Sequence, residues 1–187
     1  MRTFIAIELS DEIRSSIDQI QSHLKYSGAD VRWVEEKNIH LTLKFLGEIT
    51  EEKLQQVIAA LEIIAEEVKP FEISIKDIGA FPKIDFPRVI WVGLDKGALE
   101  SAELAKKIDD ALSKIGFEKE SRPFAAHLTI GRVRSPKNKE ALKQKISTLN
   151  SKFSTKIQLI SSVTLFQSKL TPHGPIYTKL HEAKLSA

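Results

Sequence analysis

The sequence predicts an α+β fold built on antiparallel sheets, and three observations lead to this prediction. Strand and helix patterns interleave along all 187 residues, yet many expected strands are separated only by short turns, unlike strict β-α-β alternation. The motif His-Leu-Thr followed by Leu or Ile occurs twice, at 40–43 and 127–130. No linker or low-complexity stretch interrupts the chain. We therefore expect a single domain over residues 1–187, with two pseudo-twofold lobes that each carry one motif.

The first half is expected to contain two strand-helix units. Apolar side chains alternate at about 3–9 and again at about 39–46, which predicts strands. Each is followed by a helical pattern that begins after a hydroxyl side chain able to cap a helix, Ser10 and then Thr50. Pro70 closes the second helix, because proline cannot continue one.

The second half is expected to be richer in strands. The patterns place strands at about 71–78, 88–94, 125–134, 157–168 and 175–185, and helices at about 99–115 and 139–149. The first two strands are separated by a turn around Phe81-Pro82 and Phe86-Pro87, and the last two by the turn 171–174. Hairpins of this kind favour antiparallel pairing.

Composition excludes several classes of protein. With no cysteines, the chain has no disulfides, no thiolate zinc site and no cysteine nucleophile. No apolar run approaches the ~18 residues of a membrane span, and the start is not a secretory signal, so we expect a cytoplasmic protein without membrane contact. The net charge of +3 suits a local anion site better than extended coating of duplex nucleic acid.

The repeated motif is the strongest signal for chemistry. Side chains alternate along a strand, so His40 and Thr42 project from one face, as do His127 and Thr129. The apolar residues between them point to the opposite face and into a core. Each copy therefore offers an imidazole and a hydroxyl side by side, and the two copies are expected to face each other across a groove.

Two imidazoles on opposite sides of a phosphorus atom can act as a general base and a general acid at neutral pH. Two threonine hydroxyls can donate hydrogen bonds to the non-bridging oxygens, whose charge grows in the transition state. Such chemistry needs no metal when the substrate is a strained cyclic phosphate. Three alternatives stay open: a purely structural role, a covalent phosphohistidine, and a metal site, although neither motif has a second ligand at a familiar spacing.

Two arginines are candidates for phosphate binding. By strict alternation Arg132 lies on the opposite face from His127, so it reaches the phosphate only if the strand bulges near Gly131. Arg122 precedes the second motif and could form a basic wall of the groove.

Aromatic residues could stack on a base. Phe45 is a candidate for this role, with Trp33 and Trp91, although core packing is the expected role of all three. The remaining histidines are expected to be solvated and without function: His23, His173 and His181.

The two motifs resemble the paired His-x-Thr-x signature of the two-histidine (2H) phosphoesterase superfamily. Within it the chain is similar to the LigT-like RNA 2',3'-cyclic phosphodiesterases, also called 2'-5' RNA ligases. The resemblance covers essentially the whole chain and extends to the stretches 2–7, 43–47, 88–91, 122–124, 131–132 and 174–177. One departure is Ala126, where relatives often have proline before the second histidine, but no chemical group is lost.

The resemblance implies a bilobal α+β fold, with two antiparallel sheets framing a central cleft and helices on the outside. It implies hydrolysis of RNA 2',3'-cyclic phosphate ends to 2'-phosphates, without metal or other cofactor. His40 would be the proton donor to the departing 3' oxygen and His127 the base that activates water, while Thr42, Thr129 and Arg132 hold the phosphate. With a 5'-hydroxyl in place of water, the same groups would join RNA ends reversibly through a 2'-5' linkage without ATP.

The expected partners are RNA with 2',3'-cyclic phosphate ends or nucleotides bearing a cyclic phosphate, acted on by a monomer. Two alternatives stay open at this point: a non-catalytic nucleotide- or RNA-binding module, and a phosphodiesterase for small nucleoside cyclic phosphates. The presence of both His and both Thr side chains argues against the first, and the mild positive charge does not separate the second from an RNA enzyme.

Overall fold

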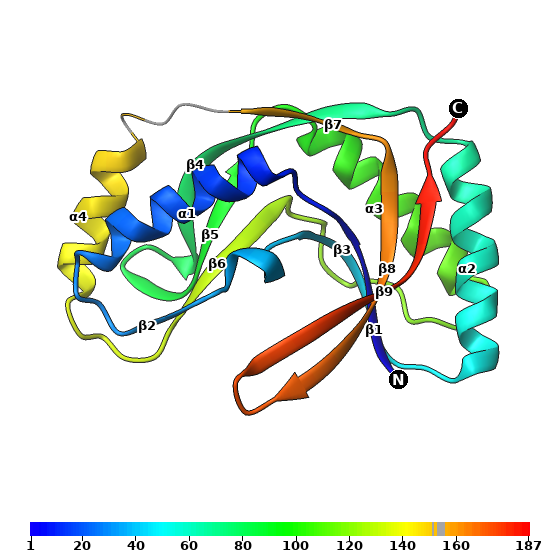
Figure 1. Cartoon of the computed structure of the whole chain (residues 1–187), viewed down its shortest axis with the longest axis horizontal. Helices are drawn as coiled ribbons and strands as arrows, with labels where there is room; N and C mark the ends of the chain where they lie inside the picture. The colour runs from blue at the N-terminus through cyan, green and yellow to red at the C-terminus, as the bar shows by residue number, and fades with distance from the viewer. Residues whose placement is uncertain (151, 153–155) are drawn as a thin grey trace.

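Two antiparallel sheets form the framework of the chain, as expected. The computed structural model describes residues 1–150, 152 and 156–187. Its elements are, in chain order, β1 (Arg2–Ile7), α1 (Asp11–Lys25), β2 (Val31–Trp33), the 3-10 turn η1 (Glu36–Asn38), β3 (Leu41–Glu48), α2 (Glu51–Glu66), β4 (Phe71–Lys83), β5 (Phe86–Leu94), α3 (Ala98–Ser113), β6 (His127–Val133), α4 (Lys139–Asn150), β7 (Ile157–Ile160), β8 (Ser162–Thr171) and β9 (Gly174–Lys184). One sheet has the order β3-β1-β8-β9 and the other β2-β6-β5-β4-β7, so each motif strand lies in a different sheet (Figure 1).

The two halves of the chain exchange helices. Helix α1 follows β1 of the four-stranded sheet, yet it lies beside α4, which packs on β4 of the five-stranded sheet. Helix α3 follows β5 of the five-stranded sheet, yet it packs against α2 and β3 on the other side. Figure 1 shows the two helix pairs at opposite ends of the molecule. Because each half supplies a helix to the other sheet, the sheets are held in one relative position.

Local sequence signals account for the helix starts. The Ser10 hydroxyl accepts a hydrogen bond from the Ile13 amide at 3.3 Å, and the Thr50 hydroxyl accepts one from the Lys53 amide at 3.2 Å. Both residues are extended N-caps, and each satisfies one amide that the helix leaves free. The predicted helix starts are confirmed.

Four details differ from the sequence predictions. The single strand expected at 157–168 is divided at Ser161, since β7 pairs with β4 whereas β8 pairs with β1 and β9. The turn expected around Pro82 and Pro87 is tighter, because these prolines pair with each other at the end of the β4–β5 ladder. Leu99, expected on the apolar face of its helix, is 68 % exposed, because the buried face of α3 is formed by Ser101, Leu104, Ala105, Ile108 and Leu112. The short elements β2 and η1 were not predicted.

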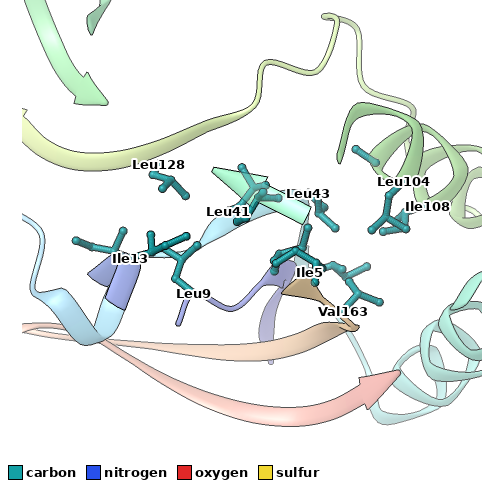
Figure 2. Close-up of a cluster of buried hydrophobic side chains, with 14 of the residues drawn as sticks. Ile5, Leu9, Ile13, Leu41, Leu43, Leu104, Ile108, Leu128 and Val163 are labelled. Carbon is teal, nitrogen blue, oxygen red and sulfur yellow. The ribbon is translucent and has the colours of Figure 1, made fainter. Parts of the chain in front are cut away.

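The core lies behind the motifs, on the face opposite their polar side chains. Leu41, Leu43, Leu128 and Ile130 are all buried, as alternation along the strands predicts. Figure 2 shows Leu41 and Leu128 in one apolar cluster with Ile5. The polar side chains of both motifs are therefore carried by strands anchored in a common core.

Candidate active site

All seven residues proposed from sequence line one cleft. The cleft has a volume of about 1560 Å³, and its walls include the candidate residues His40, Thr42, Phe45, Arg122, His127, Thr129 and Arg132. Strand β3 contacts strand β6 across the boundary between the sheets, which brings the first motif next to the second. The groove expected between the repeated motifs is thus present.

His40 lies just before β3 in an aromatic enclosure. Its ring stacks on Phe4 at 4.7 Å between centroids and an interplanar angle of 26°, and meets Tyr177 edge-on at 5.2 Å. The Asn38 backbone accepts a hydrogen bond from the ring. Burial lowers the pKa of His40 from 6.5 to about 4, against the opposing effect of the Asn38 bond. The imidazole of His40 is therefore neutral at pH 7 in the free protein.

His127 begins β6 and has a fixed tautomer. Its Nδ1 lies 2.7 Å from the carbonyl oxygen of Ala125. Because a carbonyl can only accept, Nδ1 carries the proton and Nε2 of the neutral ring keeps its lone pair. Phe81 packs edge-on against the ring at 5.0 Å between centroids and holds its orientation. This arrangement suits a general base.

Arg132 was predicted to reach the cleft only if its strand bulges near Gly131, and the structure contains such a bulge. In the β5–β6 pairing, Ile90 is opposite Gly131 while Trp91 is opposite Thr129, so Ile130 is an extra residue. An extra residue reverses the alternation beyond it, which returns Arg132 to the cleft side where it is found. A glycine is needed here, because a Cβ at position 131 would lie 2.7 Å from Val31 Cγ1.

Of the three aromatic candidates for base stacking, two line the cleft and one packs against a neighbouring strand. Phe45 is 65 % exposed, so the core role expected for it is wrong: its side chain lies on the cleft side of β3 and not in the core. Trp33 is half-buried and also lines the cleft. Trp91 instead covers Gly79, where a Cβ would lie 2.3 Å from its ring, in agreement with the expected packing role.

A buried lysine ties the cleft walls together. The side chain of Lys44, on β3, is only 2 % exposed, and its Nζ donates to Asp109 Oδ1 at 2.5 Å and to the Glu118 carbonyl at 2.9 Å. Asp109 belongs to α3, and Glu118 to the segment that continues through Arg122 to the second motif. Lys44 thus links the strand of the first motif to the approach of the second, and sequence reasoning did not identify it.

Four further polar or aromatic residues of the cleft wall were not proposed as site residues from the sequence: Arg2, Arg32, His173 and Tyr177. They come from β1, β2, the β8–β9 turn and β9, so only the pairing of distant strands brings them together. His173 is exposed in a turn, as expected, and this turn forms part of the cleft wall. The other two histidines lie outside the cleft: His181 pairs with Glu62, and His23 Nδ1 donates to the Gln19 carbonyl at 2.8 Å.

The described residues were also considered as ligands of a metal ion and as membrane spans. They contain no group of three or more His, Asp or Glu side chains placed to hold a metal ion. None of the helices in the same part of the chain combines the length and the hydropathy needed to span a membrane.

Comparison with known proteins supports the internal repeat. The family model described as LigT like Phosphoesterase matches this chain twice, over residues 7–91 and 92–177. Each match contains one His-x-Thr motif. The repeat read from the sequence therefore extends over the two halves of the chain.

Full-length relatives are similar as well. The RNA 2',3'-cyclic phosphodiesterase of Methanocaldococcus jannaschii is 39 % identical over 97 % of this chain and 99 % of its own length. That of Methanothermobacter thermautotrophicus is 37 % identical, with 99 % of both chains covered. The crystal structure of a Thermus thermophilus protein, TT0787, superposes with a TM-score of 0.81 at 25 % identity, over 99 % of this chain and 98 % of that one.

Proposed function

The chain belongs to the LigT-like phosphoesterase family, and we propose that it hydrolyses RNA 2',3'-cyclic phosphate ends to 2'-phosphomonoesters. The observation that carries this proposal is the placement of two His-x-Thr pairs, one from each sheet, in a single cleft. Relatives that this chain matches over nearly their full length are named for the same reaction.

His127 is the proposed base. With Nδ1 engaged by the Ala125 carbonyl, Nε2 takes a proton from a water molecule as the water oxygen forms a bond to phosphorus. A positioned base of this kind typically contributes about 10²–10⁴-fold to the rate. The fixed tautomer supports the assignment, because no ring rotation is needed before the proton transfer.

His40 is the proposed acid. It gives a proton to the 3' oxygen as the bond between phosphorus and that oxygen breaks, and the phosphate stays on the 2' oxygen. The low pKa of His40 in the free cleft, about 4, means that the proton must be bound together with the substrate. A negatively charged phosphate beside the ring favours the imidazolium form, so substrate binding and protonation of His40 are coupled.

The remaining side chains stabilise negative charge. Thr42 and Thr129 are half-buried in the cleft wall, where their hydroxyls can donate to the non-bridging oxygens. Arg132 adds a fixed positive charge that can hold two of these oxygens at once. Hydrogen-bond donors that are positioned before the reaction stabilise the transition state, because negative charge on the non-bridging oxygens increases there. The same steps, with a 5'-hydroxyl in place of water as the nucleophile, give a 2'-5' linkage, and their reversal cleaves that linkage.

The experiment that tests the proposal is incubation with a short RNA ending in a 2',3'-cyclic phosphate, in the presence of EDTA, followed by identification of the product. We expect a 2'-phosphate with the unchanged protein, and losses of about 10²–10⁴-fold with His40→Ala and with His127→Ala. His23→Ala, an exposed histidine on α1, is the matched control and should keep full activity. Binding of the RNA without turnover would contradict the proposal and indicate a binding module.

A further inference from the structure

Two arginines lie directly opposite each other on neighbouring strands at one end of the cleft. Strand β2 pairs with β6 in a register that sets Arg32 against Arg132, and both residues line the cleft. Opposed residues of an antiparallel pair have Cβ atoms about 4.5–5.5 Å apart, and like charges at this position destabilise a sheet. Such a pair is tolerated best where anions occupy the space beside it.

Neither arginine of this pair forms an ion pair with a carboxylate in the part of the chain that the structure describes. None of the ion pairs found among residues 1–150, 152 and 156–187 involves Arg32 or Arg132. Glu35 is the nearby acid on the same segment, but it pairs with Lys37 at 2.9 Å, and Arg32 is only the smallest of the effects that lower its pKa.

The other acids of the cleft wall are also engaged elsewhere. Asp109 and Glu120 lie 2.5 and 3.6 Å from Lys44 Nζ, and Glu48 lies 3.2 Å from the amino terminus. The positive charge of the Arg32–Arg132 pair is therefore available to a ligand.

The guanidinium of Arg32 is placed against a hydrogen-bonded turn. A Cβ on Gly174 would lie 3.6 Å from Arg32 Nη2, which locates this group beside the β8–β9 turn. The Thr171 hydroxyl donates to the Gly174 carbonyl at 2.7 Å and accepts from the His173 amide at 3.2 Å, which closes the turn. The Asn38 side chain donates to the Pro175 carbonyl at 3.2 Å, and this ties the hairpin to the turn that precedes His40. Figure 1 shows the β8–β9 hairpin extending away from the body of the molecule.

The shape of a ribose indicates which part of the substrate reaches Arg32. The base leaves the sugar at C1' and the chain continues from C4', on opposite sides of the ring oxygen, while the cyclic phosphate bridges O2' and O3'. Phe45 and Arg122 lie toward the α3 end of the cleft, since β3 packs on α3 and Arg122 follows that helix. A base placed beside Phe45 directs the 5' carbon toward the opposite end, where Arg32 and His173 lie.

We infer that Arg32 forms a second anion subsite, which binds the phosphodiester on the 5' side of the terminal nucleotide while Arg132 binds the terminal phosphate. Arg32 is then the residue that selects an RNA chain over a nucleoside 2',3'-cyclic phosphate. This inference rests on the proposed function, because it assumes that the cyclic phosphate lies between the two motifs.

The first test compares two substrates of the whole protein, adenosine 2',3'-cyclic phosphate and a diadenosine ending in the same group. The kcat/KM ratio of dinucleotide to mononucleotide should fall about 10- to 100-fold in Arg32→Gln, the range of a lost charge-assisted hydrogen bond. Arg134→Gln is the matched control, because Arg134 is exposed at the end of β6 and is not part of the cleft wall. It should leave the ratio unchanged. An unchanged ratio in Arg32→Gln overturns the inference.

The second test does not depend on turnover and so separates this inference from the proposed function. Calorimetric titration measures binding of a diadenosine 2'-phosphate whose internal linkage is either a phosphodiester or a neutral methylphosphonate, with 2'-O-methyl on the first nucleoside. Neutralising the linkage should weaken binding about 10- to 100-fold in the unchanged protein and less than about 3-fold in Arg32→Gln. Equal weakening in both proteins overturns the subsite, even if hydrolysis is confirmed. The expected pattern in a protein without hydrolytic activity supports the subsite and rejects the enzyme.

Discussion

Substitution of His40 by phenylalanine should change how the stability of the protein depends on pH. Burial against Phe4 and Tyr177 lowers the pKa of His40 from 6.5 to about 4. Since the folded chain has the lower pKa, the unfolded chain binds more protons between these two values. The contribution of His40 to the free energy of unfolding is therefore complete above pH 6.5 and is lost as the pH falls toward 4.

The size of this loss follows from the shift in pKa. A difference of this size between the folded and unfolded pKa of His40 corresponds to about 3 kcal/mol in total, of which about 2 kcal/mol is lost between pH 7 and pH 5. Other titrating groups contribute to the absolute curve, but they cancel when unchanged protein and variant are compared. Phenylalanine keeps a ring in the aromatic enclosure without a group that titrates.

The assay is urea unfolding followed by circular dichroism at pH 7 and pH 5. The unchanged protein should lose about 2 kcal/mol more than His40→Phe over this interval. His23→Asn serves as the control for removal of a histidine, because the His23 ring is exposed on α1 and lies outside the cleft. Parallel curves for the unchanged protein and His40→Phe would refute a buried, neutral His40 and with it the coupling of protonation to substrate binding.

Three further outcomes are expected. Turnover should be the same in EDTA and in its absence, since the proposed proton transfers use two histidines; loss of activity restored by a divalent cation would contradict this. Lys44→Met should lower the free energy of unfolding by about 3 kcal/mol, because it leaves Asp109 without its buried partner, whereas Lys106→Met, at an exposed pair, should cost less than about 1 kcal/mol in the same urea titration. Gly131→Ala should lower the free energy of unfolding by about 1–3 kcal/mol, because the added Cβ would overlap Val31. A variant as stable as the unchanged protein would contradict this and show that β2 can shift to accommodate a Cβ.

The exchange of helices between the sheets gives the cleft its stability. Gln21 of α1, buried, donates to the carbonyls of Val34 and Ile130 at 2.8 Å each. One side chain thus joins the first helix, the segment after β2 and the strand of the second motif. The position of each motif depends on contacts made by the opposite half of the chain.

The sequence by itself determined the parts of this protein that depend on local periodicity. Alternation along 40–43 and 127–130 placed His and Thr on one face and apolar residues on the other, and the capping side chains Ser10 and Thr50 set two helix starts. These signals act over a few residues, so they are visible without the fold. They were sufficient to predict an α+β fold and the two motifs of the site.

Only the tertiary structure decided what surrounds those motifs. Phe4 and Tyr177 approach His40 from β1 and β9, and Arg32 meets Arg132 through the register of β2 on β6. Register between distant strands depends on the packing of the whole core and on bulges such as the one at Ile130. No local pattern encodes it. The low pKa of His40 arises for the same physical reason, because desolvation is a property of the closed enclosure and not of the motif.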